Sequence, residues 1–320
     1  MSKTYHFISG LPRSGSTLLS SILKQNPRFT TNISDPLILF ASSIIRDTNN
    51  AVGMGISCPV EKRREIIKDL FDSYYKNDTE VCFNTNRGWS AETSLLKDIY
   101  PNFKMIVCLR DVPWILDSFE QLNAKNPYTI KPLYHHQELP TVHDRSAMLM
   151  GEIQNAAGYV RGPLANVQQS MFCNEVNQIC YVEYDTLVNN PLGVMKEIYE
   201  FLGEPWFEHD FNNVEDSHDE FDDHAKIKGL HTVRRKVEYK HRESILPNET
   251  WNKYQGFTFW KDNNFNKNKL NWITGNSQSY NRSQSMGQTL TKPTTLVSRP
   301  NTLTNNTVPK PAVPFTNRQL

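Results

Sequence analysis

The sequence of 320 residues lacks long apolar runs and lacks an excess of either charge. No stretch approaches the roughly 20 apolar residues that a transmembrane helix needs, and residues 1–4 lead into a strand-like run without the apolar core of a signal peptide. The 35 Lys and Arg residues nearly balance the 34 Asp and Glu residues, for a formal net charge of +1. We therefore expect a cytoplasmic protein with no membrane or nucleic-acid partner.

Cysteine is also scarce. The five cysteines are odd in number and form no Cys-x-x-Cys pair: Cys58, Cys82, Cys108, Cys173 and Cys180. This pattern predicts free thiols in a reducing compartment and excludes a disulfide framework. The acidic run 215–224 has the residue types of a metal site but no recognisable ligand spacing, so we predict no metal site and interpret the run as a solvated loop.

Apolar residues become rare after Trp272, where the composition shifts to Ser, Thr, Asn, Gln and Pro. Residues 275–320 hold five prolines and five basic residues and no acid, which leaves 30 basic and 34 acidic residues in the first 274. Such a composition cannot bury enough apolar surface to offset the entropy of ordering. We predict a folded domain over 1–274 and a disordered tail over 275–320.

Strand-like and helix-like segments alternate through the domain. Apolar runs typical of strands occur at Tyr5–Ser9, Val81–Phe83, Lys104–Leu109 and Ile179–Glu183. The amphipathic stretches that follow them are Leu18–Lys24, Glu92–Tyr100, Pro113–Leu122 and Leu192–Leu202. This alternation predicts a three-layer α/β fold of the P-loop kind, with a central parallel sheet and helices on both faces. Helix-like segments 58–76 and 145–176 have no preceding strand and are expected to be helical insertions.

The loop after the first strand carries the most informative pattern. Gly10 and Gly15 are spaced as in the P-loop frame G-x-x-x-x-G, and such a loop directs backbone N–H groups and a helix N-terminus toward a phosphate. The next two residues of the frame are Lys and Ser or Thr, whereas this chain has Ser16 and Thr17. The lysine that contacts terminal phosphates in kinases and NTPases is therefore absent.

Three stretches resemble sulfotransferases that use 3′-phosphoadenosine 5′-phosphosulfate (PAPS). The first resembles the loop that binds the 5′-phosphosulfate, in the arginine form of the tyrosylprotein sulfotransferases, and comprises Pro12, Arg13, Ser14, Gly15, Ser16 and Thr17. The second is a strand that ends in Arg110 with Ser118 eight residues later, and the resemblance implies that this pair binds the 3′-phosphate. The third surrounds Tyr184, which the resemblance places beside the nucleotide.

Arg87 follows a predicted strand at the edge of the sheet where α/β proteins bind ligands. The resemblance implies that it contacts the sulfuryl group, as a lysine does in tyrosylprotein sulfotransferases. Packing of Arg87 on Trp89 at the surface is an equally good interpretation.

A basic segment at 229–236 resembles the one that closes over the cofactor in this family. Arg235 or Lys236 is therefore expected to neutralise the 3′-phosphate, with a solvated basic face as the alternative.

The resemblance also requires a base that accepts the proton of the acceptor. Asp35 lies near the position of the catalytic glutamate of tyrosylprotein sulfotransferases, although an ungapped count from Arg13 ends at Ser34. Asp35 is also a plausible helix cap ahead of Pro36. His136 and His231 are the alternative bases.

Together these motifs predict an enzyme that transfers a sulfuryl group from PAPS to a hydroxyl or amine, releases PAP and requires no metal. Arg13, Arg87 and Asp35 are its predicted catalytic residues. Its acceptor is a small molecule, a glycan or a peptide that the sequence does not identify. The alternatives are a P-loop nucleotide kinase and a nucleotide-binding module without catalysis.

Deletion of residues 276–320 is expected to leave the melting temperature and the affinity for PAP nearly unchanged, because the tail has no periodic apolar face that could dock on the domain. Thermal unfolding and calorimetric titration of the truncated chain check this. A drop in melting temperature of more than a few degrees would show that the tail packs on the domain.

Overall fold

A computed structural model describes residues 3–49, 52–134, 138–153, 158–216, 218–262 and 270–276. Met1–Tyr280 form one compact unit of the chain. The predicted tail lies outside the described residues apart from Gly275 and Asn276, and His136 lies outside them as well.

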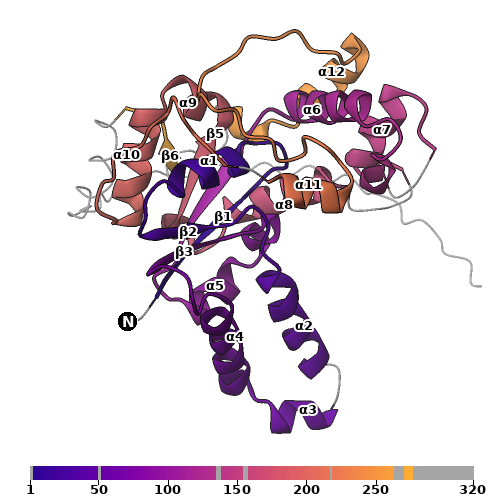
Figure 1. Ribbon diagram of the computed structural model, residues 1–320. Helices are drawn as coiled ribbons and strands as arrows, with labels where there is room; N and C mark the ends of the chain where they lie inside the picture. The colour runs from indigo at the N-terminus through magenta and orange to yellow at the C-terminus, as the bar shows by residue number, and fades with distance from the viewer. Residues whose placement is uncertain are drawn as a thin grey trace, which may run out of the picture. The chain divides into compact units, whose positions relative to one another are not determined.

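A six-stranded parallel sheet forms the centre of the unit (Figure 1), which confirms the predicted α/β architecture. The strands are β1 (Thr4–Gly10), β2 (Phe29–Thr31), β3 (Val81–Thr85), β4 (Lys104–Leu109), β5 (Ile179–Glu183) and β6 (Asn271–Ile273). Their order across the sheet is β2-β3-β1-β4-β5-β6. Strand β6 has only three residues and was not predicted, because a run this short carries no period-two signal.

Alternate residues of the central strands enter two separate cores. In β1, Phe7 joins one core and Ile8 the other. The core around Ile8 is covered by α1 (Ser16–Leu23), α9 (Tyr184–Asn189) and α10 (Pro191–Leu202). The core around Phe7 is covered by α5 (Thr93–Ile99), α6 (Val112–Lys125) and α8 (Arg161–Ser170), together with part of α4 (Val60–Tyr74). Helices therefore cover both faces of the sheet, as predicted.

The predicted insertion at 58–76 is one continuous helix, α4, as expected. Two further helices precede it, α2 (Leu37–Asn49) and α3 (Val52–Ser57), and α2 contacts both α3 and α4. The segment 145–176 is not one continuous helix. Helix α7 (Val142–Leu149) ends in the first half of this segment, and α8 lies in the second half. The remaining helices are α11 (Asp219–Ala225), α12 (Asn248–Gln255), η1 (Arg87–Ala91), η2 (Lys131–Tyr134), η3 (Val176–Gln178) and η4 (Phe259–Lys261). Among the described helices, none combines the length and the apolar character needed to span a bilayer.

One expectation about this region was wrong. The acidic run 215–224, interpreted as a solvated loop, contains most of helix α11. Asp222 of this helix is buried, with 4% of its surface exposed. The run appeared solvated because its charges are dense, whereas at least two of its carboxylates, those of Asp216 and Asp222, face the protein and accept hydrogen bonds there.

The last residue of β1 fixes how closely β1 and β4 approach. Gly10 pairs with Cys108 and has a φ of +123°. A Cβ at Gly10 would lie 2.1 Å from the carbonyl oxygen of Cys108. Only glycine therefore permits this register, and the register places the loop after β1 directly beside the loop after β4.

Gly10→Ala is expected to lower the free energy of unfolding by about 2–4 kcal/mol, since left-handed backbone strain adds to the overlap with Cys108. Gly203→Ala is the matched control, because Gly203 also has a positive φ of +76° but a Cβ there meets no atom within 4 Å. The control should lose about 1 kcal/mol. Denaturant unfolding of both variants measures the difference. Equal losses in the free energy of unfolding would show that the backbone shifts to remove the overlap between the new Cβ and Cys108.

Candidate functional site

The loop between β1 and α1 forms a tight turn whose backbone geometry suits an anion. Arg13 and Gly15 both have positive φ, +57° and +94°, and the Ser14 hydroxyl donates to the carbonyl oxygen of Leu11 at 2.6 Å. Gly15 is the N-cap of α1, and no side chain among the described residues caps this end of the helix. The first N–H groups of α1 are therefore directed toward the cavity that Ser16 and Thr17 line.

Tyr184, at the start of α9, packs against this turn. A Cβ at Gly15 would come within 2.8 Å of the Tyr184 ring. The guanidinium of Arg110 lies 4.3 Å from the centroid of the same ring, on the cavity wall. The structure thereby brings Tyr184 beside both the turn after β1 and Arg110.

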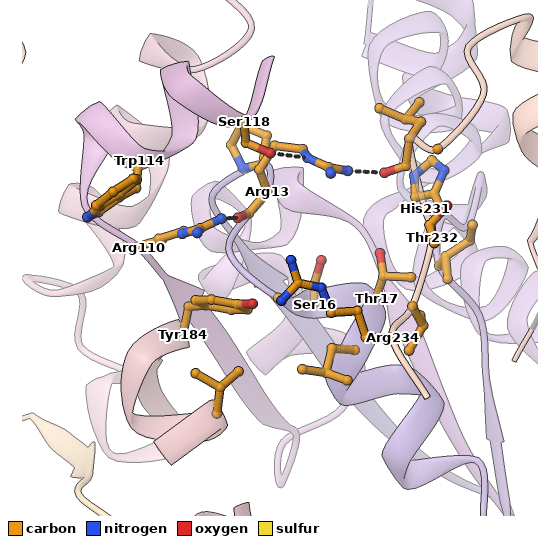
Figure 2. A pocket seen from close by; sticks show the side chains of 18 of the residues that line it. Arg13, Ser16, Thr17, Arg110, Trp114, Ser118, Tyr184, His231, Thr232 and Arg234 are labelled. Carbon is orange, nitrogen blue, oxygen red and sulfur yellow. Dashed lines mark hydrogen bonds between the residues drawn. The ribbon is translucent and has the colours of Figure 1, made fainter. Parts of the chain in front are cut away.

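Arg13, Arg110 and Ser118 meet at the mouth of the turn (Figure 2). Arg13 Nε donates to Ser118 Oγ at 3.0 Å, and another nitrogen of its guanidinium donates to the carbonyl oxygen of Leu230. Arg110 Nη1 donates to the carbonyl oxygen of Arg13 at 3.1 Å. Within the described ranges neither guanidinium forms an ion pair with a carboxylate, and Arg110 Nε is buried without a partner.

Their surroundings disfavour the positive charge that both arginines carry. The pKa of Arg13 is lowered to about 10, mainly by loss of contact with water and in addition by the neighbouring charge of Arg110. Burial likewise lowers the pKa of Arg110. Both groups remain protonated at neutral pH, so the site has a strong requirement for a negative ligand.

These groups line a cavity of about 460 Å³. Its wall carries eight basic side chains, Arg13, Arg87, Arg110, Lys125, Arg234, Lys236, Lys240 and Arg242. Only two acidic side chains, Asp185 and Glu238, are among its described lining residues. A nearly neutral chain therefore concentrates positive potential in one place, which is the local arrangement that binding of a multiply charged anion requires.

Arg87 lies on this wall and not on Trp89. It donates to the Tyr159 hydroxyl at 2.6 Å, and its guanidinium is 4.3 Å from the centroid of the Tyr159 ring. Trp89 is buried and donates to Asn84 instead. The packing alternative considered for Arg87 therefore does not apply.

A segment of residues 229–245 runs along the cavity, and buried carboxylates hold both of its ends. Asp222 accepts from the N–H of Gly229 at 3.0 Å near the start. Asp117 of α6 accepts from the N–H of Ile245 at 2.8 Å near the end and forms an ion pair with Arg242. The segment is thus fixed to α11 and α6.

The structure does not bring Arg235 to the cavity. Its guanidinium is exposed and donates to Glu215 at 2.6 Å. Arg234 lines the cavity, and so does Lys236, the other residue expected to neutralise the 3′-phosphate. Within residues 229–240 Arg235 is the one residue that the wall lacks, because its guanidinium is paired with Glu215 on the exposed side.

Asp35 is also placed apart from the cavity wall. Its buried carboxylate accepts from the Thr85 N–H at 2.7 Å, from Asn32 Nδ2 at 2.9 Å and from the Tyr74 hydroxyl at 3.1 Å. Ser34, at the position reached by the ungapped count, lines the cavity. Asp35 thus holds its loop against the end of β3, from which Arg87 follows.

Two residues near the cavity carried no sequence signal. Tyr159 lies in a segment expected to be continuous helix, and no motif surrounds it. Asp222 could not be distinguished from its acidic neighbours Asp219, Glu220 and Asp223. His231, in contrast, was named as an alternative base and lines the cavity.

Residues 6–208, more than half of the chain, match the profile of the sulfotransferase family. The chain therefore belongs to the sulfotransferase family and is a transferase by that membership. The matched range contains the turn after β1, Arg110, Ser118 and Tyr184, and it ends before α11.

Solved structures give weaker similarities. A sulfotransferase from Alicyclobacillus acidocaldarius is 15% identical with a TM-score of 0.46, over 68% of this chain and 88% of that chain. The sulfotransferase domain of the Synechococcus PCC 7002 olefin synthase is 17% identical with a TM-score of 0.44, over 82% and 96%. The sulfotransferase domain from the curacin biosynthetic pathway is 16% identical with a TM-score of 0.43, over 65% and 76%. No curated protein matches the chain.

Asp35→Asn is expected to lower the free energy of unfolding by about 1–3 kcal/mol, because the amide NH₂ would face one of the donors that the carboxylate now accepts from. Ser34→Ala, at an exposed neighbouring side chain, should change it by less than about 0.5 kcal/mol. Thermal or urea unfolding checks both. An Asp35→Asn variant as stable as the unmodified chain would show that the buried carboxylate is dispensable for folding.

Proposed function

We propose that this chain transfers a sulfuryl group from PAPS to a hydroxyl or amine and releases PAP. The observation that carries the proposal is the convergence of Arg13, Arg110 and Ser118 at the N-terminus of α1. Two cations without a carboxylate partner among the described residues are stable together only with an anionic ligand. A nucleotide with a 5′-phosphosulfate and a 3′-phosphate supplies an anion for each.

The residues present fit such a donor. The backbone N–H groups of the Pro12–Thr17 turn would bind the 5′-phosphosulfate at the helix N-terminus. Arg110 has a buried Nε without a partner among the described residues. Ser118 accepts from Arg13, and its own O–H has no acceptor within the described part of the chain, so this pair would bind the 3′-phosphate. Lys236, one of the two residues expected to neutralise the 3′-phosphate, and Arg234 would add positive charge from the cavity wall in place of Arg235.

Arg13 and Arg87 would act on the transferred group. Negative charge in such a transfer develops on the sulfuryl oxygens and on the oxygen that bridges to the leaving phosphate, in analogy with phosphoryl transfer. Guanidinium groups fixed by hydrogen bonds to Ser118, Leu230 and Tyr159 need little reorganisation to stabilise that charge. The acceptor would lie on the side of the cavity lined by Phe119 and Tyr159.

A nucleotide kinase is disfavoured by two features of the turn and of the neighbouring strand. Ser16 occupies the position of the phosphate-binding lysine. Asp111, the acid after β4, forms an ion pair with Lys261 at 2.6 Å, so it is not positioned as a free Mg²⁺ ligand. Calorimetric titration without Mg²⁺ tests the assignment: PAP should bind at least tenfold more tightly than ADP or ATP, and the reverse order would support a kinase.

Arg110→Ala is expected to weaken PAP binding by about 1.5–3 kcal/mol, which is the usual contribution of a hydrogen bond to a charged group. Binding of adenosine 5′-phosphosulfate should change much less, since this nucleotide has no 3′-phosphate. Equal losses for the two nucleotides would show that Arg110 does not bind the 3′-phosphate.

Arg235→Ala is the matched control for that titration. It removes an arginine of the same charge from the exposed side of the 229–245 segment, where its partner is Glu215. The affinity for PAP should stay within about twofold of the unmodified chain, because an exposed and already paired charge contributes little.

A further inference from the structure

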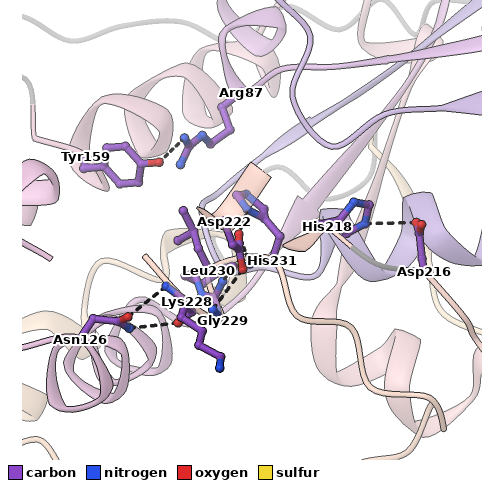
Figure 3. Close-up of polar contacts among 11 residues, drawn as sticks. Arg87, Asn126, Tyr159, Asp216, His218, Asp222, Lys228, Gly229, Leu230 and His231 are labelled. Atoms are coloured by element: carbon purple, nitrogen blue, oxygen red, sulfur yellow. Dashed lines mark hydrogen bonds and ion pairs between the residues drawn. The ribbon is translucent and has the colours of Figure 1, made fainter. Parts of the chain in front are cut away.

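A histidine–carboxylate pair lies beside the arginine cluster, on elements beyond the family match (Figure 3). Asp222 of α11 accepts from the backbone N–H of His231 at 3.1 Å, and its Oδ1 lies 2.8 Å from His231 Nδ1. The same carboxylate accepts from the Gly229 N–H. These bonds fix both the backbone and the ring of His231.

The pairing determines which ring nitrogen carries the proton. A carboxylate oxygen accepts, so Nδ1 of His231 donates to Asp222 and Nε2 is left with a free lone pair. The ring is further held by Phe221, whose centroid lies 4.6 Å away at an interplanar angle of 85°. Only 17% of the His231 side chain is exposed, and it lines the cavity.

His231 is joined directly to the turn that would hold the sulfuryl group. The carbonyl oxygen of the preceding residue, Leu230, accepts from the guanidinium of Arg13. Arg13 in turn contacts Ser118. His231 therefore directly follows Leu230, which is a hydrogen-bond partner of Arg13, and Arg13 is the arginine that would act on the transferred sulfuryl group.

The net effect of the surroundings of His231 is to lower its pKa, which favours the neutral imidazole. Burial is the largest cause that lowers its pKa, and the positive charges of Arg13 and His218 act in the same direction, against the opposing effect of Asp222. A neutral imidazole at pH 7 is the form that can accept a proton.

We propose that His231 is the general base of the reaction and that Asp222 is its positioning residue. This inference rests on the proposed function. His231 Nε2 takes the proton of the acceptor hydroxyl or amine as the acceptor atom forms its bond to sulfur. The bond between sulfur and the 5′-phosphate oxygen breaks, and its electron pair leaves on PAP. The ionised Asp222 stabilises the imidazolium that results.

Asp35 is a less suitable base than His231. Its carboxylate is 1% exposed and already accepts from Thr85, Asn32 and Tyr74, so it has no open path to a hydroxyl in the cavity. It is also absent from the described cavity wall. Asp35 therefore supports the loop, and the proton goes to His231.

The test measures PAP released from saturating PAPS, with water and a panel of 4-nitrophenol, tyramine and glucosamine as acceptors. His231→Asn keeps an N–H that can donate to Asp222 but has no basic nitrogen, so turnover should fall by about 10²–10⁴-fold with the Kd for PAP within twofold. Added imidazole should restore part of the rate. Asp35→Asn, assayed below its melting temperature, should stay within about threefold of the unmodified chain.

His218→Asn is the matched control. His218 also lies beside an aspartate, 3.1 Å from Asp216, but it is outside the main cavity wall. Its turnover should be unchanged above the pH at which His231 loses its proton, because His218 acts on His231 only through its charge. Loss of turnover in Asp35→Asn with retention in His231→Asn would overturn the assignment. An unmodified chain that binds PAP and releases none from PAPS would overturn the proposed function itself.

Two measurements separate positioning by Asp222 from a purely structural role. The turnover of the unmodified chain should rise with pH through an apparent pKa below 6.5 and then level, since the base works only when neutral. Asp222→Asn should lower turnover by about 10–100-fold and displace that pKa. Nitrogen NMR of the unmodified chain should show His231 protonated at Nδ1 at pH 7. Protonation at Nε2 would overturn the proposal without any variant.

Discussion

The site depends on holding two like charges together where water is scarce. Arg13 and Arg110 repel each other, and the surrounding protein lowers the pKa of both. Neutral acceptors fix them instead of carboxylates: the Arg13 carbonyl for Arg110, and Ser118 and the Leu230 carbonyl for Arg13. Because these partners carry no full charge, the positive potential of the cluster is preserved for a ligand.

The buried acids near the cavity form hydrogen bonds with the 229–245 segment and form no ion pair with Arg13 or Arg110 among the described residues. Asp222 holds one end of the segment and Asp117 the other. Their charges offset only part of the effect of burial, which lowers the pKa of both Arg13 and Arg110. The same carboxylate that anchors the backbone at Gly229 orients the ring of His231, so the local fold and the proposed proton transfer share one residue.

Much of the fold, and the grouping of four of the candidate site residues, could be predicted from the sequence. Strands β1, β3, β4 and β5 are apolar runs between helical periods, and the turn after β1 has glycines at fixed spacing. Those signals are local, so they are readable one segment at a time. Arg13, Arg110, Ser118 and Tyr184 are brought together because their elements end at the same edge of a parallel sheet.

The positions of Arg235 and Asp35 could not be predicted in the same way. All residues of 229–240 except Arg235 line the cavity, and the outward direction of Arg235 depends on its partner Glu215, which lies 20 residues earlier in the chain. Asp35 is enclosed by Thr85 and Tyr74, which are distant in the sequence.

The register between β1 and β4 also constrains how this sequence can change. A side chain at position 10 would collide with the backbone of Cys108, whose carbonyl oxygen is the same for every amino acid. A substitution at Gly10 therefore has no compensating side-chain substitution at position 108, because the obstacle is the main chain itself. At most core positions a larger residue can be accommodated by a smaller neighbour, but this compensation is not available at position 10. The separation of the loops after β1 and β4 is therefore fixed by Gly10.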